Sequence, residues 1–432
     1  MNSIWTETAQ PPRFPSLEKD IKTDVLIIGG GMAGLLCAHA LQAAGVDYTL
    51  VEAERICDGI TKNTTAKITA QHGLVYHRLF KKFGREKTEL YLKANQAAIE
   101  KYRALCETID CDFEEKDSFV YSSESPRAIE RELEVLENLH FPAKFVEKLP
   151  LPISVSGAVK FEKQAQFHPL KFAYGLARGL RIYEKTKVLE LTPNAAITSG
   201  GKISAKKTIV ATHFPFINKH GFYFLKMYQH RSYVLALENA PNINGMYVDD
   251  AKAGLSFRNY KNLLFLGGGD HRTGEKGGNW RELEAFAKAH YLQAKSVSRW
   301  ATQDCMTLDE VPYIGQYSKR TPNFYVATGF NKWGMTSSMV AADILTDAVL
   351  DRENPYASVF YPSRTILRKQ LAVNAGKAIL NLITPTVPRC PHMGCALKYN
   401  AQERSWDCPC HGSRFTEDKK LIDNPATGDA KK

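Results

Sequence analysis

The sequence predicts a mixed α/β protein with a nucleotide-binding domain, a second domain that carries an antiparallel sheet, and a small metal-binding unit at its C-terminal end. Two patterns predict this organisation. Near the N-terminus an apolar strand runs into a glycine-rich turn and a helix, and after residue 389 cysteines and histidines gather in two boxes. The 432 residues are enough for two or three domains of ordinary size.

The overall composition is that of a soluble globular protein, with 44% apolar and 24% charged residues. The net charge is +11, but the basic residues are scattered, which favours a solvated surface and gives no reason to expect nucleic-acid binding. A basic surface could still favour an acidic partner or substrate or an anionic membrane. The first twenty residues lack a signal pattern, and the longest apolar stretch, residues 25–45, is broken by glycines. We therefore expect a cytoplasmic protein without a transmembrane segment.

The glycine-rich turn has the full context of a dinucleotide site. Residues 23–28 form an apolar strand, and Gly29, Gly31 and Gly34 follow in the spacing G-x-G-x-x-G. A small-residue helix comes next, and a second strand ends at Glu52. The glycines let a pyrophosphate approach the helix N-terminus, and the acid bonds ribose hydroxyls, which favours FAD or NAD over NADP. The alternative, a structural βαβ unit with tolerated glycines, is disfavoured by the complete pattern.

Two further segments suit a flavin. Residues 55–67 form a polar loop whose Thr65 is placed to contact the cofactor, although a plain surface loop has the same composition. Residues 323–328 predict a strand that ends in a glycine turn and a helix start, where N–H groups and a helix dipole can face a flavin ring. The expected contacts there are Gly329, Gly334, Met335 and Thr336. Residues 267–272 lack the last glycine of a second fingerprint, which argues against a second nucleotide site.

The C-terminal boxes have the spacing C-x-H, fifteen residues, C-x2-H, with one extra cysteine in each box. Their six residues are Cys390, His392, Cys395, Cys408, Cys410 and His411. Two thiolates and two imidazoles can hold a [2Fe–2S] cluster, with Cys390, His392, Cys408 and His411 as ligands. In that arrangement Cys395 and Cys410 can pair and tie the two loops together. The alternative is zinc, which takes four ligands and leaves two cysteines idle.

These patterns resemble two known families. Residues 20–355 resemble the D-amino-acid oxidase, glycine oxidase and sarcosine oxidase superfamily of FAD enzymes, most specifically in the N-terminal fingerprint and the segment A-T-G-F-x-x-W-G-M-T. The two boxes resemble the Rieske motif of the disulfide-bearing type, with Ser413 matching the hydroxyl donor to the cluster. Phe415 replaces the tyrosine of that family, which implies a lower potential. The whole is similar to a bacterial fusion of the two.

The resemblance also implies the domain organisation. A discontinuous, Rossmann-like FAD-binding domain takes residues 20–75, 150–215 and 305–355, and the α+β substrate domain takes 76–149 and 216–304. A linker helix at 356–386 leads to the Rieske unit at 387–432. This unit is short for its family, because no base-sheet strands separate the linker from the first box. It would therefore depend on its cluster, its disulfide and docking to the flavin part.

The resemblance implies an FAD-dependent enzyme that dehydrogenates an amine or amino-acid-like small molecule and passes electrons through the [2Fe–2S] cluster to an external acceptor. Arg258, on a predicted strand, is the candidate for holding a substrate carboxylate, although a surface or structural arginine is slightly favoured. His72 could lie near the flavin or carry it covalently, although such a histidine is more often hydrogen-bonded in the interior.

Two alternative functions keep the same fold. One is an electron-transfer or redox-sensing protein without a small substrate, and the other is an O₂-using flavin oxidase with a vestigial cluster domain. Sarcosine-oxidase relatives place a lysine beside the flavin to help oxygen react, and the matching strand at residues 263–266 has none. This absence favours a dehydrogenase. The sequence does not specify the substrate, the acceptor or the oligomeric state.

Overall fold

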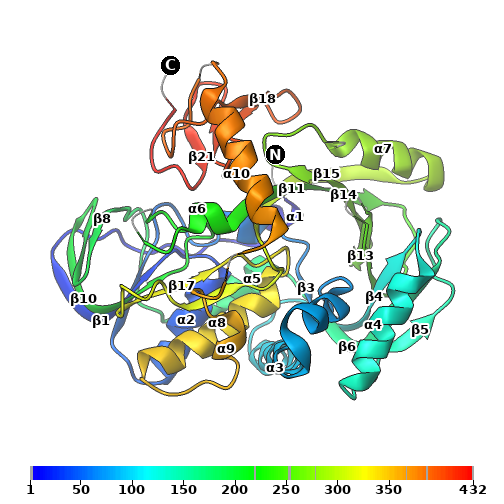
Figure 1. Cartoon of the computed structure of the whole chain (residues 1–432), viewed down its shortest axis with the longest axis horizontal. Coiled ribbons are helices and arrows are strands. Elements are labelled where there is room, and N and C mark those ends of the chain that lie inside the picture. The colour runs from blue at the N-terminus through cyan, green and yellow to red at the C-terminus, as the bar shows by residue number, and fades with distance from the viewer. Residues whose placement is uncertain are drawn as a thin grey trace.

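The computed structural model describes residues 3–217, 220–251, 254–277, 279–365, 367–385 and 388–430. The described residues form two large sheets side by side, with a small C-terminal sheet at one end of the molecule (Figure 1). The mixed α/β class predicted from the sequence is confirmed, with a separate C-terminal unit and a second sheet that is antiparallel except for the parallel pair β4 (Glu114–Ser122) and β12 (Met246–Asp249).

The first large sheet is built from parallel strands in the order β16-β17-β10-β1-β2-β7, and the hairpin β8-β9 extends it beyond β10. Only β16 at its edge and the hairpin run antiparallel among the described strands. Their bounds are β1 (Ile21–Ile28), β2 (Tyr48–Val51), β7 (Ile182–Tyr183), β8 (Val188–Thr192), β9 (Ala195–Thr198), β10 (Gly201–Val210), β16 (Tyr313–Gln316) and β17 (Phe324–Thr328).

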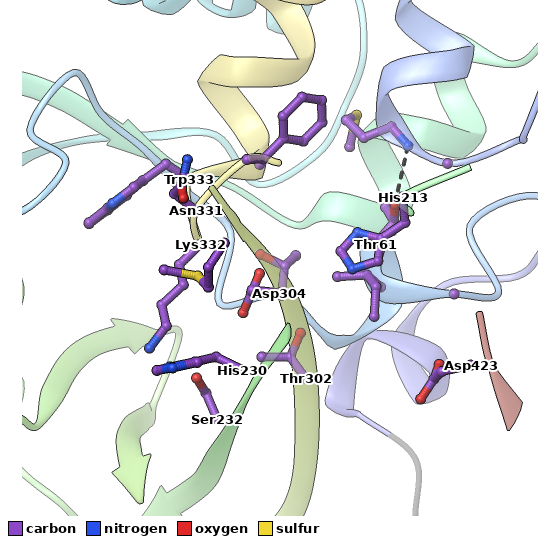
Figure 2. A pocket seen from close by; sticks show the side chains of 18 of the residues that line it. Thr61, His213, His230, Ser232, Thr302, Asp304, Asn331, Lys332, Trp333 and Asp423 are labelled. Atoms are coloured by element: carbon purple, nitrogen blue, oxygen red, sulfur yellow. Dashed lines mark hydrogen bonds between the residues drawn. The ribbon is translucent and has the colours of Figure 1, made fainter. Parts of the chain in front are cut away.

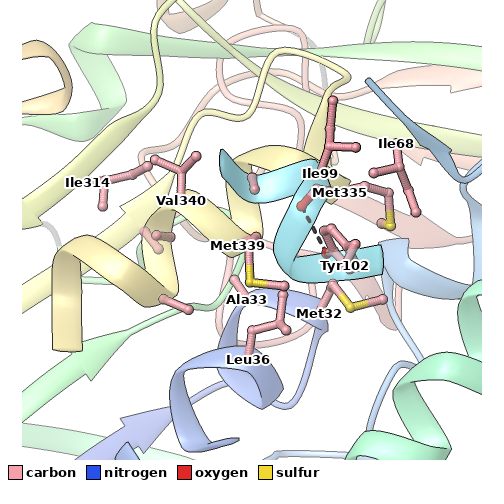
Figure 3. Close-up of a cluster of buried hydrophobic side chains, with 14 of the residues drawn as sticks. Met32, Ala33, Leu36, Ile68, Ile99, Tyr102, Ile314, Met335, Met339 and Val340 are labelled. Carbon is pink, nitrogen blue, oxygen red and sulfur yellow. Dashed lines mark hydrogen bonds between the residues drawn. The ribbon is translucent and has the colours of Figure 1, made fainter. Parts of the chain in front are cut away.

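Helices cover this sheet and create the largest core. Residues 25–28 of β1 are buried on both faces, as expected for a central parallel strand with helices around it. Helices α2 (Met32–Ala43) and α8 (Gly334–Val349) pack against each other through small and flexible apolar side chains, among which Met32, Met335 and Met339 are labelled in Figure 3. Tyr102 reaches this cluster from another helix and donates to the carbonyl of Met335 at 2.9 Å. The cluster fixes both helix N-termini at one edge of the sheet.

The second large sheet runs β15-β11-β14-β13-β12-β4-β6-β3, with β5 paired to β6. Its strands are β3 (Lys67–Ile68), β4 (Glu114–Ser122), β5 (Lys144–Val146), β6 (Gly157–Gln166), β11 (Met227–Glu238), β12 (Met246–Asp249), β13 (Ser256–Tyr260), β14 (Leu263–Arg272) and β15 (Lys295–Thr307). Strands β3 and β6 belong to this sheet although both lie in ranges that the sequence assigns to the FAD-binding domain. The domain ranges themselves stay predictions.

The remaining helices and the C-terminal strands complete the chain. The helices are α1 (Ile4–Thr8), the short 3-10 helix η1 (Ile60–Asn63), α3 (Val75–Cys106), α4 (Pro126–Asn138), α5 (Pro169–Leu176), α6 (Tyr223–Lys226), α7 (Asn279–His290), α9 (Ala357–Phe360) and α10 (Lys369–Ile383). The C-terminal sheet contains β18 (Lys398–Asn400), β19 (Ser405–Asp407), β20 (Arg414–Thr416) and β21 (Leu421–Asp423). The predicted boundary between residues 386 and 387 lies outside the described residues. Among the described helices, none has the length and apolar character needed to cross a bilayer.

Gly34 sets the distance between α2 and β1. A Cβ atom at this position would lie 1.9 Å from the carbonyl oxygen of Gly29, so any side chain would push the helix off the strand. We expect Gly34→Ala to lower the free energy of unfolding by about 3 kcal/mol and to release the bound nucleotide cofactor. Thermal unfolding and the flavin content of the purified protein measure both effects.

Gly376→Ala in α10 is the matched control, because its added Cβ meets nothing within 4 Å. Stability should stay the same or rise by about 0.5–1 kcal/mol in this variant, since alanine is the better helix former. Equal stability of the two variants would contradict the proposed packing of α2 on β1.

Candidate active site and cluster site

A cavity of about 1360 Å³ lies between the two large sheets and is named here the central cavity. It is lined by the glycine turn after β1, by the loop before β3, by strands β11, β14 and β15, and by the segment that leads into α8. Small-molecule pockets commonly have about 300–1,000 Å³, so the central cavity has room for a dinucleotide together with a small substrate.

The glycine turn forms one end of the central cavity. Gly29 has a φ of 110°, and a Cβ there would lie 2.7 Å from the carbonyl oxygen of Ala211, so only glycine fits. Gly31 lines the cavity at the start of α2, and its nearest neighbour is the Thr61 hydroxyl. That hydroxyl also accepts from the N–H of Met32 at 3.1 Å. The bare backbone at a helix N-terminus fits a pyrophosphate.

Glu52 lies beside this turn and also lines the central cavity. Its carboxylate accepts from the N–H groups of Gly30 at 2.7 Å and Glu54 at 2.9 Å. Burial raises the pKa of this carboxyl, and the backbone bonds oppose that shift by favouring the ionised form. The residue predicted to bond ribose hydroxyls is thus held at the end of β2 facing the cavity.

The other predicted cofactor residues fall into two groups, those that line the central cavity and those that do not. Thr65, Gly334 and Met335 line the central cavity. Gly34, Gly329 and Thr336 are not among its lining residues within the described part of the chain and instead shape the elements around it. Their contacts with a cofactor stay predictions.

Arg258 is buried behind the cavity wall and is not among the described lining residues. Its Nη1 donates to the carbonyl oxygens of Thr65 at 2.5 Å and Ala66 at 3.0 Å. The guanidinium lies 5.7 Å from the ring centre of Trp5 and 5.5 Å from that of Phe265. Burial lowers its pKa to about 9. These contacts support the loop that carries Thr65, while a direct role in binding substrate stays a prediction.

His72 lines the central cavity with both ring nitrogens engaged. Nδ1 lies 2.6 Å from the Tyr91 hydroxyl, and Nε2 lies 2.8 Å from the carbonyl of Thr69 and 3.0 Å from the hydroxyl of Thr336. The ring stacks on Trp333 at 5.0 Å between centres. Burial lowers the pKa of His72 to about 3, so the ring is neutral. It ties the start of α8 to the cavity wall.

A charged group that sequence reasoning missed lies at the other end of the cavity. Lys332 forms an ion pair with Asp270, and Asp304 and His230 lie nearby, as Figure 2 shows for the labelled side chains. Burial alone would lower the pKa of Lys332, but the carboxylates of Asp270 and Asp304 raise it. Burial lowers the pKa of His230 to about 3, and Lys332 adds to this effect. These side chains come from β11, β14, β15 and the turn before α8, which no local motif connects.

Asp304 differs from the other acids of this end because it receives no hydrogen bond from the described residues. Burial raises its pKa to about 6, and Lys332 acts in the opposite direction. At neutral pH the group is therefore mostly an anion inside a cavity. Such a carboxylate is suited to a cationic ligand, because burying an unpaired charge is costly.

The predicted cluster residues converge at the C-terminal unit from two loops. The imidazole rings of His392 and His411 lie 4.9 Å apart between centres, and hydrogen bonds to Cys408 and Ser413 lower the pKa of the Cys390 thiol to about 7. Nδ1 of His411 is buried without a hydrogen-bond partner among the described residues. The two imidazole rings lie near each other, and the Cys390 and Cys408 thiols hydrogen-bond each other. Two thiols and two imidazoles are a ligand set that fits a [2Fe–2S] cluster.

The predicted disulfide is confirmed, since Cys395 and Cys410 are bonded across 15 residues. It joins the two loops that carry the cluster ligands. Ser413 lies where its hydroxyl hydrogen-bonds the Cys390 thiol, and it also accepts from the N–H of Ala426 at 3.0 Å. Ser413 therefore connects the cluster site to the loop after β21.

The C-terminal unit is held against β11, β14 and β15 mainly by polar contacts. Gln229 Nε2 donates to the carbonyls of His411 at 2.8 Å and Asn424 at 3.0 Å. Gln303 Nε2 donates to the carbonyl of Gly412 at 2.9 Å, and Arg272 donates to two further carbonyls of the same loop. All of these carbonyl acceptors lie within or next to the loops that carry the predicted cluster ligands. The same hydrogen bonds therefore hold the C-terminal unit against the sheet and fix the shape of these loops.

One short segment belongs to both sites. Thr212 and His213 follow β10 and line the central cavity, and Asn424 Nδ2 donates to the carbonyls of Thr212 at 2.5 Å and Phe214 at 3.1 Å. The Phe214 ring lies 6.4 Å from the ring of the cluster residue His392. Residues 212–214 therefore form a wall that faces the cavity on one side and the cluster site on the other.

Comparisons with known proteins identify two families along the chain. The sequence model of the FAD dependent oxidoreductase family matches residues 24–348, and that of the Rieske [2Fe-2S] domain matches residues 362–432. The protein YhfW of Bacillus subtilis (strain 168), whose name calls it a Rieske 2Fe-2S iron-sulfur protein, is 34% identical over 98% of this chain and 96% of its own length.

A second sequence relative and a solved structure are also similar to this chain. Gamma-glutamylputrescine oxidoreductase of Escherichia coli (strain K12) is 26% identical over 46% of this chain and 50% of its own length. The crystal structure of glycine oxidase from Geobacillus kaustophilus has a TM-score of 0.67 and 19% identity, and it covers 80% of this chain and 99% of its own. The latter comparison establishes the fold alone.

Glu403 anchors the C-terminal unit through buried charges. Its carboxylate pairs with Arg231 of β11 and with Arg414 of β20, and these two cations hold its pKa at about 2 against the opposing effect of burial. Glu403→Gln leaves two guanidinium groups without their shared anion, so we expect a loss of about 3–5 kcal/mol and a lower iron content. Iron analysis and thermal unfolding test this.

Glu417→Gln is the matched control, because Glu417 pairs with the exposed Arg404 in the same unit. An exposed ion pair contributes about 0–1 kcal/mol, so this variant should keep its iron and its melting temperature. Similar losses in both variants would show that the unit is not held through Glu403.

Proposed function

We propose that this chain, which belongs to the FAD dependent oxidoreductase family and carries a Rieske [2Fe-2S] domain, dehydrogenates an amine or amino-acid-like small molecule and passes the electrons through the cluster to an external acceptor. The enzyme class and both cofactors follow from the family. The substrate, the acceptor and the cytoplasmic location predicted from the sequence are parts of the proposal.

The observation that carries the electron route is the shared wall at residues 212–214. Thr212 and His213 line the cavity that fits FAD. The carbonyls of Thr212 and Phe214 accept hydrogen bonds from Asn424 of the C-terminal loop, and the Phe214 ring lies 6.4 Å from that of His392. A fixed interface of this kind suits electron transfer within one molecule. A substrate-free electron carrier is less well supported, because charged side chains line the central cavity at the end away from the glycine turn.

Asp304 supports an amine as the substrate class. Its carboxylate faces the central cavity without a hydrogen bond from the described residues, and Lys332 beside it is already paired with Asp270. A protonated amine bound there would have its nitrogen oriented by Asp304. The name of the Escherichia coli relative, gamma-glutamylputrescine oxidoreductase, agrees with this class.

The chemistry then needs orientation and exclusion of water. After the bound amine has lost its extra proton, its oxidation breaks the C–H bond beside nitrogen and one N–H bond, leaves an imine and yields two electrons and two protons. Bound FAD would supply the two-electron acceptor, and the cluster would carry electrons singly. His72, stacked on Trp333, and His230 line the central cavity, where the substrate would react. Both imidazole rings are neutral, because burial lowers the pKa of each, so they add no charge there. Asp304 holds the amine through its carboxylate oxygens.

A flavin oxidase is the second candidate, and one observation favours it. The strand at residues 263–266 has no lysine, but Lys67 and Lys332 both line the central cavity. Burial and the nearby Arg258 lower the pKa of Lys67 to about 7. Two lysines therefore line the cavity that would hold the flavin, even though the predicted strand carries none. Release of peroxide under air distinguishes the oxidase from the dehydrogenase.

His411→Ala tests the route through the cluster. We expect it to lose iron, to keep FAD, and to be reduced by substrate at the wild-type rate, while turnover with a one-electron acceptor falls at least about 100-fold. Anaerobic stopped-flow absorbance and steady-state assays measure the two steps. The exposed His290→Ala in α7 is the control and should behave as wild type. Undiminished acceptor turnover without the cluster would contradict the proposed route.

The pH dependence tests Asp304. In the free enzyme its pKa is raised to about 6, and only the ionised form attracts a protonated amine. We therefore expect kcat/KM to rise as the pH increases through about 6 and to level off above it. Asp304→Asn should abolish this rise of kcat/KM with pH and increase KM at least about tenfold. Asp304→Glu should keep the rise. An unchanged profile in the asparagine variant would exclude Asp304 as the amine-binding group.

A further inference from the structure

Helix α10 turns its polar face inward and its apolar face outward. Asn374 and Asn381 are only 5% and 6% exposed, and Arg272 donates to the side-chain oxygen of Asn374 at 2.8 Å. The backbone carbonyl of Asn381 accepts from the N–H of Ala396 in the C-terminal unit at 3.0 Å. A helix at the surface of a globular protein normally does the opposite and buries its apolar side.

The outward face carries large aliphatic side chains at helical spacing. Their exposed fractions are 60% for Ile379, 61% for Leu380, 43% for Leu382 and 71% for Ile383. Leu367 before the helix and Met393 after it are also exposed. We call these six side chains the apolar face of α10. Of the sixteen exposed large hydrophobic side chains in the described residues, eight lie between residues 361 and 393, so they are concentrated in one region.

The same region is basic. Residues 354–402 contain no aspartate or glutamate and six basic residues. Two of these six are neutralised by acids elsewhere in the chain, Arg364 by Asp309 and Lys377 by Glu275. Arg368, Arg389 and Lys398 have no ion pair among the described residues. The segment that carries the apolar face therefore has a net positive charge.

We propose that α10 binds flat in the surface of an anionic lipid bilayer. An amphipathic helix of 15 residues with aliphatic side chains on one side and basic residues around it has the composition of an interfacial helix, which gains from apolar burial and from attraction to acidic head groups. Two copies of the chain joined through this face would bring their uncompensated basic residues together, so a second copy is the less suitable occupant.

The apolar face ends beside the cluster. Arg389 Nη1 donates to the carbonyls of Leu382 at 3.1 Å and Gly394 at 2.8 Å, which ties the end of α10 to the loop that carries His392. Membrane binding through α10 would hold this loop at the bilayer surface (α10 and the C-terminal strands are orange and red in Figure 1). The inference does not depend on the proposed substrate or electron route.

Flotation of the full-length holoprotein with lipid vesicles tests the proposal. We expect binding to vesicles of phosphatidylglycerol and phosphatidylcholine at low salt, weaker binding at 0.5 M salt, and little binding to phosphatidylcholine alone. The double variant L380Q/I383Q should bind at least about tenfold less, because both side chains are exposed and would enter the bilayer. Flavin and iron content confirm that the variant is folded.

Leu189→Gln in β8 is the matched control, since Leu189 is 62% exposed and lies far from α10 in the sequence. It should bind vesicles as wild type does. The proposal is overturned if the wild type ignores anionic vesicles, if L380Q/I383Q binds them equally, or if light scattering shows a dimer that L380Q/I383Q separates. The last outcome would identify a second copy as the occupant. None of these results depends on enzymatic activity.

Discussion

The side-chain amide of Asn424 holds the two functional parts together. It bonds the carbonyls of Thr212 and Phe214, on either side of His213, at the point where β10 ends. The same strand end touches the glycine turn, because Gly29 packs against the carbonyl of Ala211. Four consecutive residues, 211–214, thereby contact the cofactor turn, the cavity and the cluster unit. A shift of the C-terminal unit would therefore displace the wall of the active site.

The interface around Asn424 is polar, and this explains how a small unit is held in one orientation. The side-chain amides of Gln229 and Gln303 are hydrogen-bonded to each other at 2.7 Å, and both also donate to carbonyls of the cluster loops. Each amide therefore holds the other in its orientation. Glu403 adds a buried carboxylate between two arginines. Buried pairs of this kind contribute little net stability, but they penalise every arrangement that separates them. The unit therefore docks specifically without a large apolar interface.

The sequence predicts both cofactors because their motifs are local. The glycine turn with Glu52 and the two cysteine–histidine boxes are each short patterns, and in the structure Gly29 and Glu52 line the central cavity while Cys395 and Cys410 are bonded. The contacts of these residues with the cofactors stay predictions. The charged end of the cavity was missed, since Asp304 lies on β15 and Lys332 lies in the turn before α8, and only the tertiary fold brings them together. Arg258 shows the converse, because a strand position does not reveal whether a side chain faces the cavity or the core.

The central claim is that substrate electrons reach the cluster inside one molecule through the wall at residues 212–214. The most direct measurement is anaerobic mixing of the holoprotein with an amine substrate, followed by rapid freezing and EPR at several protein concentrations. The account predicts a reduced Rieske signal whose rate of appearance does not change with protein concentration. A cluster that stays oxidised after the flavin is bleached, or a rate proportional to protein concentration, would contradict it.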